Sequence, residues 1–416
     1  MQRLAGTWLW LILCGVAELA VGGCADLDEG PAAPGAADLL GGETGPGRGG
    51  GTDTELVPLA SDAVLRVHYP RKDALFSRIA VRGDAGGLSW GSGRAMTRIN
   101  ETTWQLRLRT SDLTGGRALE WKPLLDDATW SRGANYRALP GQTVDIYPHF
   151  VQAGGRYERR YSSFRSTKLG NTRGVWVYLP PSYDENPDPQ NRYPVVYMHD
   201  GQNLFDPRYA FGGRTWRVAE ALDGGIDALD PSLHLPEVVV VGPENTADRI
   251  YEYTPTKGTE KDLEGGGGDL YLDFLISELK PVIDRELRTL PDAAHTALAG
   301  SSLGGLITAY AGTKHAAVFG RLGIFSPSTW WDGKVIITMV KASPQRPQRI
   351  YVDSGDSGPS GDDSVNTRAL ADTYRTDLGY RDGVDFLYVL MPGAVHNEDA
   401  WAARLPAALR FLLAGL

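Results

Sequence analysis

Residues 300–304, with the sequence GSSLG, constrain the fold more than any other stretch of the chain. A short apolar run, 295–299, precedes them, and a run of small helix-forming residues follows from Leu306. Glycines on both sides of Ser302 allow a sharp reversal between a strand and a helix. We therefore predict that Ser302 projects its hydroxyl from this elbow. The N–H of Leu303 then lies at the positive end of the helix, where an oxyanion is stabilised. The alternative is a glycine-rich turn with an idle serine.

The chain has 416 residues, which is long enough for two or more domains, and its formal net charge of −9 argues against a nucleic-acid partner. From residue 165 onward, apolar runs alternate with helical patterns, which predicts an α/β domain over residues 165–416 with a mainly parallel sheet covered on both faces. Within it, the pattern of 269–289 predicts a helix that Pro281 kinks. The expected strands lie near 174–179, 194–199, 238–241, 296–299, 321–325, 350–352 and 386–390.

The first 24 residues have the pattern of a targeting signal. Arg3 precedes an apolar stretch, 4–17, that is too short for an ordinary transmembrane helix. Residues 21–24 (VGGC) resemble a bacterial lipobox, which implies cleavage before Cys24 and lipidation of its thiol. We therefore expect a lipid anchor to a membrane of the cell envelope, periplasmic or outer. The alternative is an ordinary secretory signal that releases the protein.

The next part of the chain is expected to be a linker followed by a β domain. Residues 25–55 are rich in Gly and Pro and predict a flexible linker. Residues 56–150 contain short alternating runs between Gly, Asp and Ser clusters, which predict a small immunoglobulin-like β-sandwich. Residues 149–165 are expected to connect it to the second domain. The runs are 63–67, 77–82, 103–108, 119–125 and 143–147.

Four tryptophans stand out in this β domain: Trp90, Trp104, Trp121 and Trp130. Their pattern resembles starch-binding modules, in which exposed tryptophan faces stack on sugar rings. Tryptophan is buried on average. We therefore expect core positions for all four, with sugar binding as the alternative.

Several motifs in the second domain match one family in the right order. They are residues 180–183 (PPSY), 193–206 (YPVVYMHDGQNLFD), the elbow, and 393–401 (GAVHNEDAW). Together they resemble the putative esterase family of α/β hydrolases, which includes esterase D, enterochelin esterases, feruloyl esterases and mycolyltransferases. The resemblance covers about residues 165–416. It implies an α/β-hydrolase fold and a serine carboxylic ester hydrolase that needs no metal and no organic cofactor.

A serine hydroxyl needs a general base, and histidine suits neutral pH. In α/β hydrolases the histidine follows the nucleophile in the chain, and of the seven histidines only His315 and His396 follow Ser302. His315 falls within the helix after the elbow, about three turns on, and points elsewhere. His396 follows a predicted strand and a glycine turn. We therefore predict that His396 is the base; the alternative is a surface loop histidine.

The resemblance also implies two further site residues. The N–H that follows the His-Asp-Gly turn belongs to Gln202 and is the expected second oxyanion donor beside that of Leu303. Arg249 matches a family position near the substrate and could hold an anionic group. A structural ion pair between Arg249 and Glu252 is the alternative.

The acid that orients His396 must lie in the loop after the strand at 349–354, which contains Asp356, Asp362 and Asp363. In feruloyl esterases the acid stands just before the next helix, which we expect to begin at Ser364. We therefore predict Asp363 as the acid. The alternative is that Asp363 only caps the helix, a contribution of about 1 kcal/mol, while Asp356 or Asp362 serves the histidine.

Taken together, these residues predict hydrolysis of a small-molecule or glycan-linked ester through an acyl-enzyme. Two alternatives are acyl transfer by the same fold, and a surface carbohydrate-binding protein with an inactive hydrolase domain. The presence of both Ser302 and His396 favours an enzyme.

Overall fold

The computed structural model describes residues 62–416 except 71, 73–74, 114–116 and 260–262. Contacts between residues divide the chain into two units, Met1–Ala60 and Ser61–Leu416, of which the second contains the described residues. The predicted targeting signal, the lipidation site Cys24 and the linker 25–55 lie outside them. In the described part, no helix is both long enough and apolar enough to cross a membrane.

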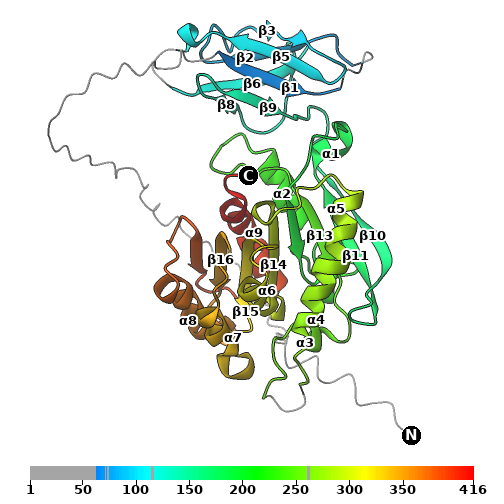
Figure 1. Cartoon of the computed structure of the whole chain (residues 1–416), viewed down its shortest axis with the longest axis vertical. Helices are drawn as coiled ribbons and strands as arrows, with labels where there is room; N and C mark the ends of the chain where they lie inside the picture. The colour runs from blue at the N-terminus through cyan, green and yellow to red at the C-terminus, as the bar shows by residue number, and fades with distance from the viewer. Residues whose placement is uncertain (1–61, 71, 73–74, 114–116, 260–262) are drawn as a thin grey trace, which may run out of the picture. The chain divides into compact units, whose positions relative to one another are not determined.

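The first strands of the second unit form two small sheets (Figure 1). One has the strand order β4-β5-β1-β9, and the other the order β3-β2-β6-β7 with β8 beside β6. All five predicted runs coincide with strands, whereas the immunoglobulin-like sandwich and the boundaries 56–150 and 165–416 stay predictions. The strands are β1 (Ala63–His68), β2 (Ile79–Gly83), β3 (Arg94–Ala95), β4 (Thr97–Arg98), β5 (Thr103–Leu108), β6 (Leu119–Leu125), β7 (Thr129–Trp130), β8 (Tyr136–Ala138) and β9 (Thr143–Ile146).

The tryptophans of this region fall into two pairs. Trp104 and Trp121 are buried in a shared hydrophobic core. Trp90 and Trp130 are instead 39% and 38% exposed, and their ring centroids lie 6.2 Å apart. The expectation of four core tryptophans is therefore right for the first pair and wrong for the second, because Trp130 lies on a two-residue strand and Trp90 outside any strand.

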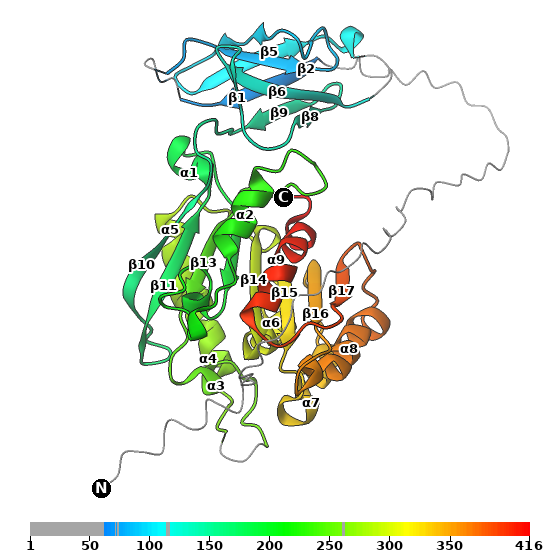
Figure 2. The same ribbon diagram turned by 180° about the vertical axis from the view of Figure 1, so that it is seen from behind.

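The second part of the unit is built on an eight-stranded sheet with the order β10-β11-β13-β12-β14-β15-β16-β17 (Figures 1 and 2). Strands β12 to β17 pair in parallel, while β10 and β11 are antiparallel to their neighbours. The predicted α/β class and mainly parallel sheet are confirmed. The strands are β10 (Arg156–Arg165), β11 (Thr172–Leu179), β12 (Val195–Met198), β13 (Val239–Pro243), β14 (Thr296–Ser302), β15 (Arg321–Pro327), β16 (Arg349–Ser354) and β17 (Phe386–Leu390).

Successive side chains of each strand point to opposite faces of this sheet. Both sets are buried, because helices cover both faces. Val195 and Tyr197 belong to a core shared with α4 to α8, whereas Val196 and Met198 belong to a core shared with α2 and α9. The helices are α1 (Pro181–Glu185), α2 (Val218–Ile226), α3 (Arg249–Glu252), α4 (Gly268–Asp273), α5 (Lys280–Glu286), α6 (Leu303–Lys314), α7 (Trp331–Ala342), α8 (Ser364–Asp372) and α9 (Glu398–Leu413).

Two local features differ from the sequence-based expectation. Strand β10 occupies most of 149–165, which we expected to be a simple connection. The expected helix 269–289 is α4 followed by a π-helical stretch, Phe274–Leu279, and then α5. The disturbance therefore precedes Pro281, which occupies a first-turn position of α5 where its missing N–H costs little.

A buried ion pair between β11 and α3 provides a test of this packing. Both oxygens of Glu252 accept from Arg173, at 2.6 and 2.9 Å, and the two side chains are almost fully buried. Removing one partner of such a pair costs about 3–5 kcal/mol, because the other charge stays buried. We expect Glu252→Gln to lower the free energy of unfolding in urea by that amount. Lys341→Ala, which removes the exposed pair with Asp377, should cost about 1 kcal/mol or less. Equal losses in the two variants would contradict this assignment.

Candidate active site

Ser302 lies at the end of β14 and directly before the first residue of α6, as the elbow predicts. Its backbone has φ 58° and ψ −123°, a conformation that non-glycine residues rarely adopt. Such strain is retained where the surrounding structure enforces it, and it is frequent at active sites. The Ser302 side chain makes no capping hydrogen bond to α6, so its hydroxyl is available for other contacts.

His199 packs directly against the elbow. A Cβ atom on Gly300 would lie 2.7 Å from Cδ2 of His199, so this position requires glycine. The imidazole is buried, and its Nδ1 lies 2.9 Å from the hydroxyl of Tyr271. Burial lowers the pKa of His199 to about 3. The ring is therefore neutral near pH 7 and supports the elbow, and this leaves His396 as the candidate base.

His396 lies between β17 and α9, and its Nδ1 is 2.5 Å from Oδ1 of Asp362. The second oxygen of this fully buried carboxylate accepts from the hydroxyl of Ser326 at 2.7 Å and from the N–H of Gly355. Burial opposes ionisation of Asp362, but the hydrogen bonds that it accepts from His396, Ser326 and Gly355 outweigh it, so the pKa of Asp362 lies below its usual value. An ionised carboxylate only accepts, so Nδ1 carries the proton and Nε2 of the neutral ring is left as a base.

Asp363, the predicted acid, does not make this contact. Its carboxylate accepts instead from the N–H of Trp330 at 3.2 Å and from the side-chain amide of Asn366 at 2.6 Å. The contact with His396 expected of Asp363 is therefore wrong: Asp362 makes it. Both aspartates have positive φ, 51° and 52°, so the chain turns between them and their side chains meet different partners. Asp356 binds the N–H of Gly393 at 2.7 Å.

The Ser302 hydroxyl has a different partner from the one that proton transfer requires. Its Oγ lies 3.3 Å from Oγ of Ser328, whose N–H donates to the carbonyl of Ser302 at 2.9 Å. Among the described residues, no hydrogen bond joins Ser302 to His396. Catalytic hydrogen bonds are often loose without substrate.

The two expected oxyanion donors lie at the carboxyl ends of adjacent strands. Gln202 is in a 3₁₀ turn (Gly201–Asn203) after β12, and Leu303 is the first residue of α6 after β14. β12 and β14 pair in parallel, so both turns are at the same edge of the sheet. The first N–H groups of a helix have no acceptor within it, which leaves that of Leu303 free to bind an anion.

Arg249 braces the turn that carries Gln202. Its Nε and Nη2 each lie 2.8 Å from one oxygen of Asp200, the residue that begins this turn. Burial would raise the pKa of Asp200, but the charge and hydrogen bonds of Arg249 hold it below its usual value. The alternative pairing of Arg249 with Glu252 is not formed, because Glu252 pairs with Arg173.

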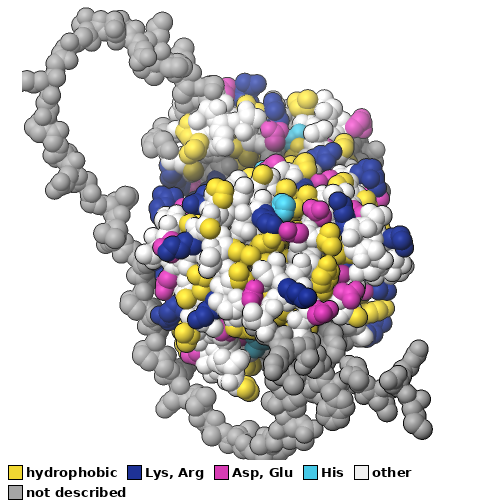
Figure 3. All heavy atoms as spheres, turned by 60° about the horizontal axis from the view of Figure 1, so that its bottom comes forward, with side chains coloured by type: hydrophobic (Ala, Val, Ile, Leu, Met, Phe, Trp, Pro, Cys, Tyr) yellow, Lys and Arg dark blue, Asp and Glu magenta, His cyan; other side chains and the backbone are white. Residues whose placement is uncertain are grey.

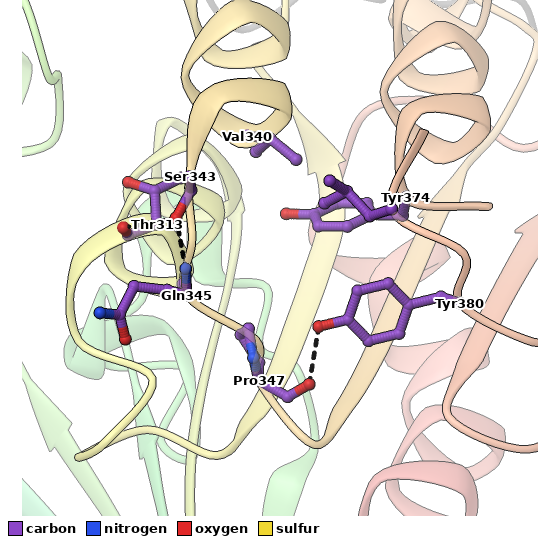
Figure 4. Close-up of a pocket in the computed structure, with 9 residues that line it drawn as sticks. Thr313, Val340, Ser343, Gln345, Pro347, Tyr374 and Tyr380 are labelled. Atoms are coloured by element: carbon purple, nitrogen blue, oxygen red, sulfur yellow. Dashed lines mark hydrogen bonds between the residues drawn. The ribbon is translucent and has the colours of Figure 1, made fainter. Parts of the chain in front are cut away.

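A separate small cavity lies between the ends of α6 and α7 and the segment after α8 (Figure 4). It is lined by Thr313, Tyr374 and Tyr380 among others, and its volume is about 10 Å³, which leaves room for one water molecule at most. Ligand pockets usually measure about 300–1,000 Å³. Thr313 lies near the far end of α6 from Ser302, about 16 Å along the helix axis. This cavity is therefore no part of the candidate site.

The charges of the described surface are mixed. On the face drawn in Figure 3, acidic and basic side chains are interspersed among hydrophobic ones. Within the described ranges, no three His, Cys, Asp or Glu side chains gather closely enough to hold a metal ion.

A family model described as "Putative esterase" matches residues 166–412, which is more than half of the chain. A Bacillus subtilis protein named "Uncharacterized protein YbbA" is 26% identical over 261 residues, covering 60% of this chain and 96% of that protein. An "Endo-1,4-beta-xylanase/feruloyl esterase" of Xylanibacter ruminicola is 28% identical over 237 residues, which are 56% of this chain and 29% of that protein.

One further relative and one solved structure are also similar to this chain. A "Siderophore triacetylfusarinine C esterase" of Aspergillus fumigatus is 25% identical over 184 residues, covering 42% of this chain and 59% of that protein. Among solved structures, an "IroE-like serine hydrolase" from Shewanella oneidensis matches with a TM-score of 0.49 and 24% identity, over 62% of this chain and 80% of that one.

The contact between His396 and Asp362 can be tested by proton NMR. A proton held between a histidine Nδ1 and a buried carboxylate resonates at low field, and His396→Gln assigns the signal. We expect Asp362→Asn to abolish this resonance and Asp363→Asn to retain it, because only the first carboxylate contacts the ring. Retention of the signal in Asp362→Asn would contradict the assignment.

Proposed function

The chain belongs to the putative esterase family, and we propose that it is a carboxylic ester hydrolase in which Ser302, His396 and Asp362 form a catalytic triad. The observation that carries this proposal is the 2.5 Å contact between His396 Nδ1 and the buried carboxylate of Asp362. A histidine that takes a proton from serine must be held in one tautomer and stabilised once charged, and a buried aspartate does both.

In the proposed reaction, the Ser302 hydroxyl turns from Ser328 toward His396 and attacks the ester carbonyl as Nε2 takes its proton. The tetrahedral intermediate collapses, the C–O bond to the alcohol breaks, and His396 returns the proton to the leaving oxygen. Water, deprotonated by the same histidine, then hydrolyses the acyl-enzyme, which releases the acid and restores Ser302. Asp362 stays ionised throughout and stabilises the imidazolium.

We propose that the N–H groups of Gln202 and Leu303 bind the oxyanion of both tetrahedral intermediates. Donors that are already fixed before the reaction stabilise the transition state, and each lowers the activation barrier by about 3 kcal/mol. The position of both residues at one sheet edge supports this role. The ion pair of Arg249 with Asp200 keeps the first of these turns in place. If Arg249 also binds an anionic group of the substrate, it must share its charge with Asp200.

For the substrate we propose a small-molecule or glycan-linked ester. Two of the relatives named above are called an endo-1,4-beta-xylanase/feruloyl esterase and a siderophore esterase, and these names support both kinds of ester. We further propose that lipidation of Cys24 attaches the enzyme to the cell envelope, on the support of the lipobox-like residues 21–24.

A second candidate function, carbohydrate binding, is favoured by the exposed pair Trp90 and Trp130. The guanidinium of Arg82 lies 5.2 Å from the Trp130 ring centroid and donates to the Trp90 carbonyl at 3.2 Å. Asp127 in turn accepts from Arg82 at 2.8 Å. Such a prearranged aromatic surface presents apolar faces for sugar rings to stack on. It would hold a glycan near the enzyme without taking part in the chemistry.

The triad predicts a specific order of losses. Ser302→Ala should leave less than about 1% of wild-type ester hydrolysis, and Asp362→Asn should lower kcat by about four orders of magnitude, because the histidine takes the wrong tautomer. Asp363→Asn is the matched control and should keep kcat close to wild type. Steady-state kinetics on a panel of aryl and acetyl esters measures all three. A normal kcat for Asp362→Asn would refute its role.

The tryptophan pair predicts retention on insoluble polysaccharide. We expect the full chain to be pulled down by starch or another insoluble glucan, and Trp130→Ala to lose most of this retention while ester hydrolysis is unchanged. Leu139→Ala, which alters another exposed apolar residue of the same region, is the control and should bind normally. Equal retention of all three proteins would exclude carbohydrate binding by this pair.

A further inference from the structure

A group of buried polar side chains lies behind Asp362, on the side away from His396. Its centre is Ser326, at the end of β15, which is fully buried and has φ 36°. A serine in this left-handed region is strained. The strained backbone allows its N–H to donate to Asp353 at 3.1 Å while its hydroxyl contacts Asp362 at 2.7 Å.

The direction of every hydrogen bond at the Ser326 hydroxyl is fixed by the chemistry of its partners. Nε1 of Trp401 lies 3.1 Å from this oxygen and Nη2 of Arg404 lies 2.8 Å from it. Both groups are donors that cannot accept, so they occupy the two lone pairs of the oxygen. The one remaining proton must go to Asp362. Ser326 can therefore serve Asp362 only as a donor.

Arg404 is the positive charge of this group. It lies on α9 and is almost completely buried, and its Nη2 is 4.0 Å from Oδ2 of Asp362. Its Nε donates at 2.8 Å to Asp353, a second fully buried carboxylate, which also accepts from the hydroxyl of Tyr351 at 2.9 Å. When His396 is protonated, charges of alternating sign thus run from His396 through Asp362 and Arg404 to Asp353.

We propose that Ser326 and Arg404 are positioning residues of the reaction: Ser326 fixes the second oxygen of Asp362 so that the first faces His396, and Arg404 keeps that carboxylate ionised while Asp353 balances its charge. This inference rests on the proposed function, since it concerns the acid of the triad. Ser326 also separates Arg404 from Asp362, so that the arginine does not draw the carboxylate away from the histidine.

Because these charges alternate in sign, removing Arg404 or Asp353 should change proton binding by His396 in opposite directions. A mere loss of packing would not produce opposite effects. Removing the charge of Arg404 leaves Asp362 a stronger proton acceptor, so the proton on His396 is held more tightly. Removing the charge of Asp353 leaves Arg404 unbalanced and has the opposite effect. Among the residues that the structure describes, Asp363 and Glu398 also interact with the charge of His396. Burial raises the pKa of both, and neither is altered in the test.

The acidic limb of the pH dependence of kcat/KM follows protonation of the base in the free enzyme. In the proposed reaction this base is His396, so the limb is sensitive to the charges around it. We expect Arg404→Met to move the limb to higher pH by about half a pH unit or more. Asp353→Asn should move it to lower pH by a smaller amount, because burial already raises the pKa of Asp353 to about 6. The near-isosteric Asp353→Asn keeps the test available if Arg404→Met does not fold.

Matched controls come from another mostly buried pair, Lys280 and Asp284 on α5, whose charged atoms are 2.7 Å apart. Lys280→Met removes a positive charge and Asp284→Asn a negative one, as the two test variants do. Both controls should leave the acidic limb at its wild-type pH. Shifts of Arg404→Met and Asp353→Asn in the same direction, or no shift beyond that of these controls, would overturn the proposal.

Ser326→Ala tests the hydroxyl itself. A hydrogen bond to a charged group contributes a factor of about 10–100, so kcat should fall by that factor while KM changes less than about twofold. An unchanged kcat would overturn the role of Ser326. If the wild type hydrolyses no ester, or Asp362→Asn keeps its activity, the proposed function itself fails. If hydrolysis depends on Asp362 but none of these variants responds, only the present inference fails.

Discussion

A buried carboxylate is stable only when its oxygens are occupied by donors, and this requirement organises the carboxyl edge of the large sheet. Asp362 meets it with three donors, His396, Ser326 and Gly355. Ser326 is the next-to-last residue of β15, Gly355 follows β16, and His396 follows β17. One side chain therefore joins the ends of three consecutive strands, and the same hydrogen bonds hold together the loops that carry the candidate site.

The sheet could be predicted from the sequence because its central strands are buried on both faces and read as unbroken apolar runs, such as residues 238–241 and 350–352. Strand β10 lacked this signal. It pairs with β11 alone, its residues are exposed or half-buried, and Arg156, Arg159 and Arg160 give it the charge typical of an edge strand. Trp90 and Trp130 were misjudged for a related reason, since average burial says little about residues at the margin of a small sheet.

The residues of the candidate site could be predicted where their order in the chain identifies them. They could not be predicted where the conformation of a single turn determines which side chain makes the contact. Ser302 follows from its flanking glycines, and His396 from its place after the last strand. Asp362 and Asp363 are neighbours in the chain, and two successive residues of positive φ, which spacing does not reveal, decide which one meets the histidine. Ser326 and Arg404 carry no local motif. Their place beside Asp362 follows from the burial and contacts in the structure, which no spacing in the sequence reveals.

Helix α9 carries more than a packing surface. Asn397 caps it, Trp401 lies edge-on to the His396 ring at a centroid distance of 5.0 Å, and Arg404 follows one turn later. Each residue of a helix advances about 100° around its axis. One residue inserted between Asn397 and Arg404 would therefore turn the arginine away from Ser326 without changing the composition or hydrophobicity of the helix. In this chain, the rotation of helix α9 about its axis, counted from its first residue, therefore belongs to the design of the candidate site.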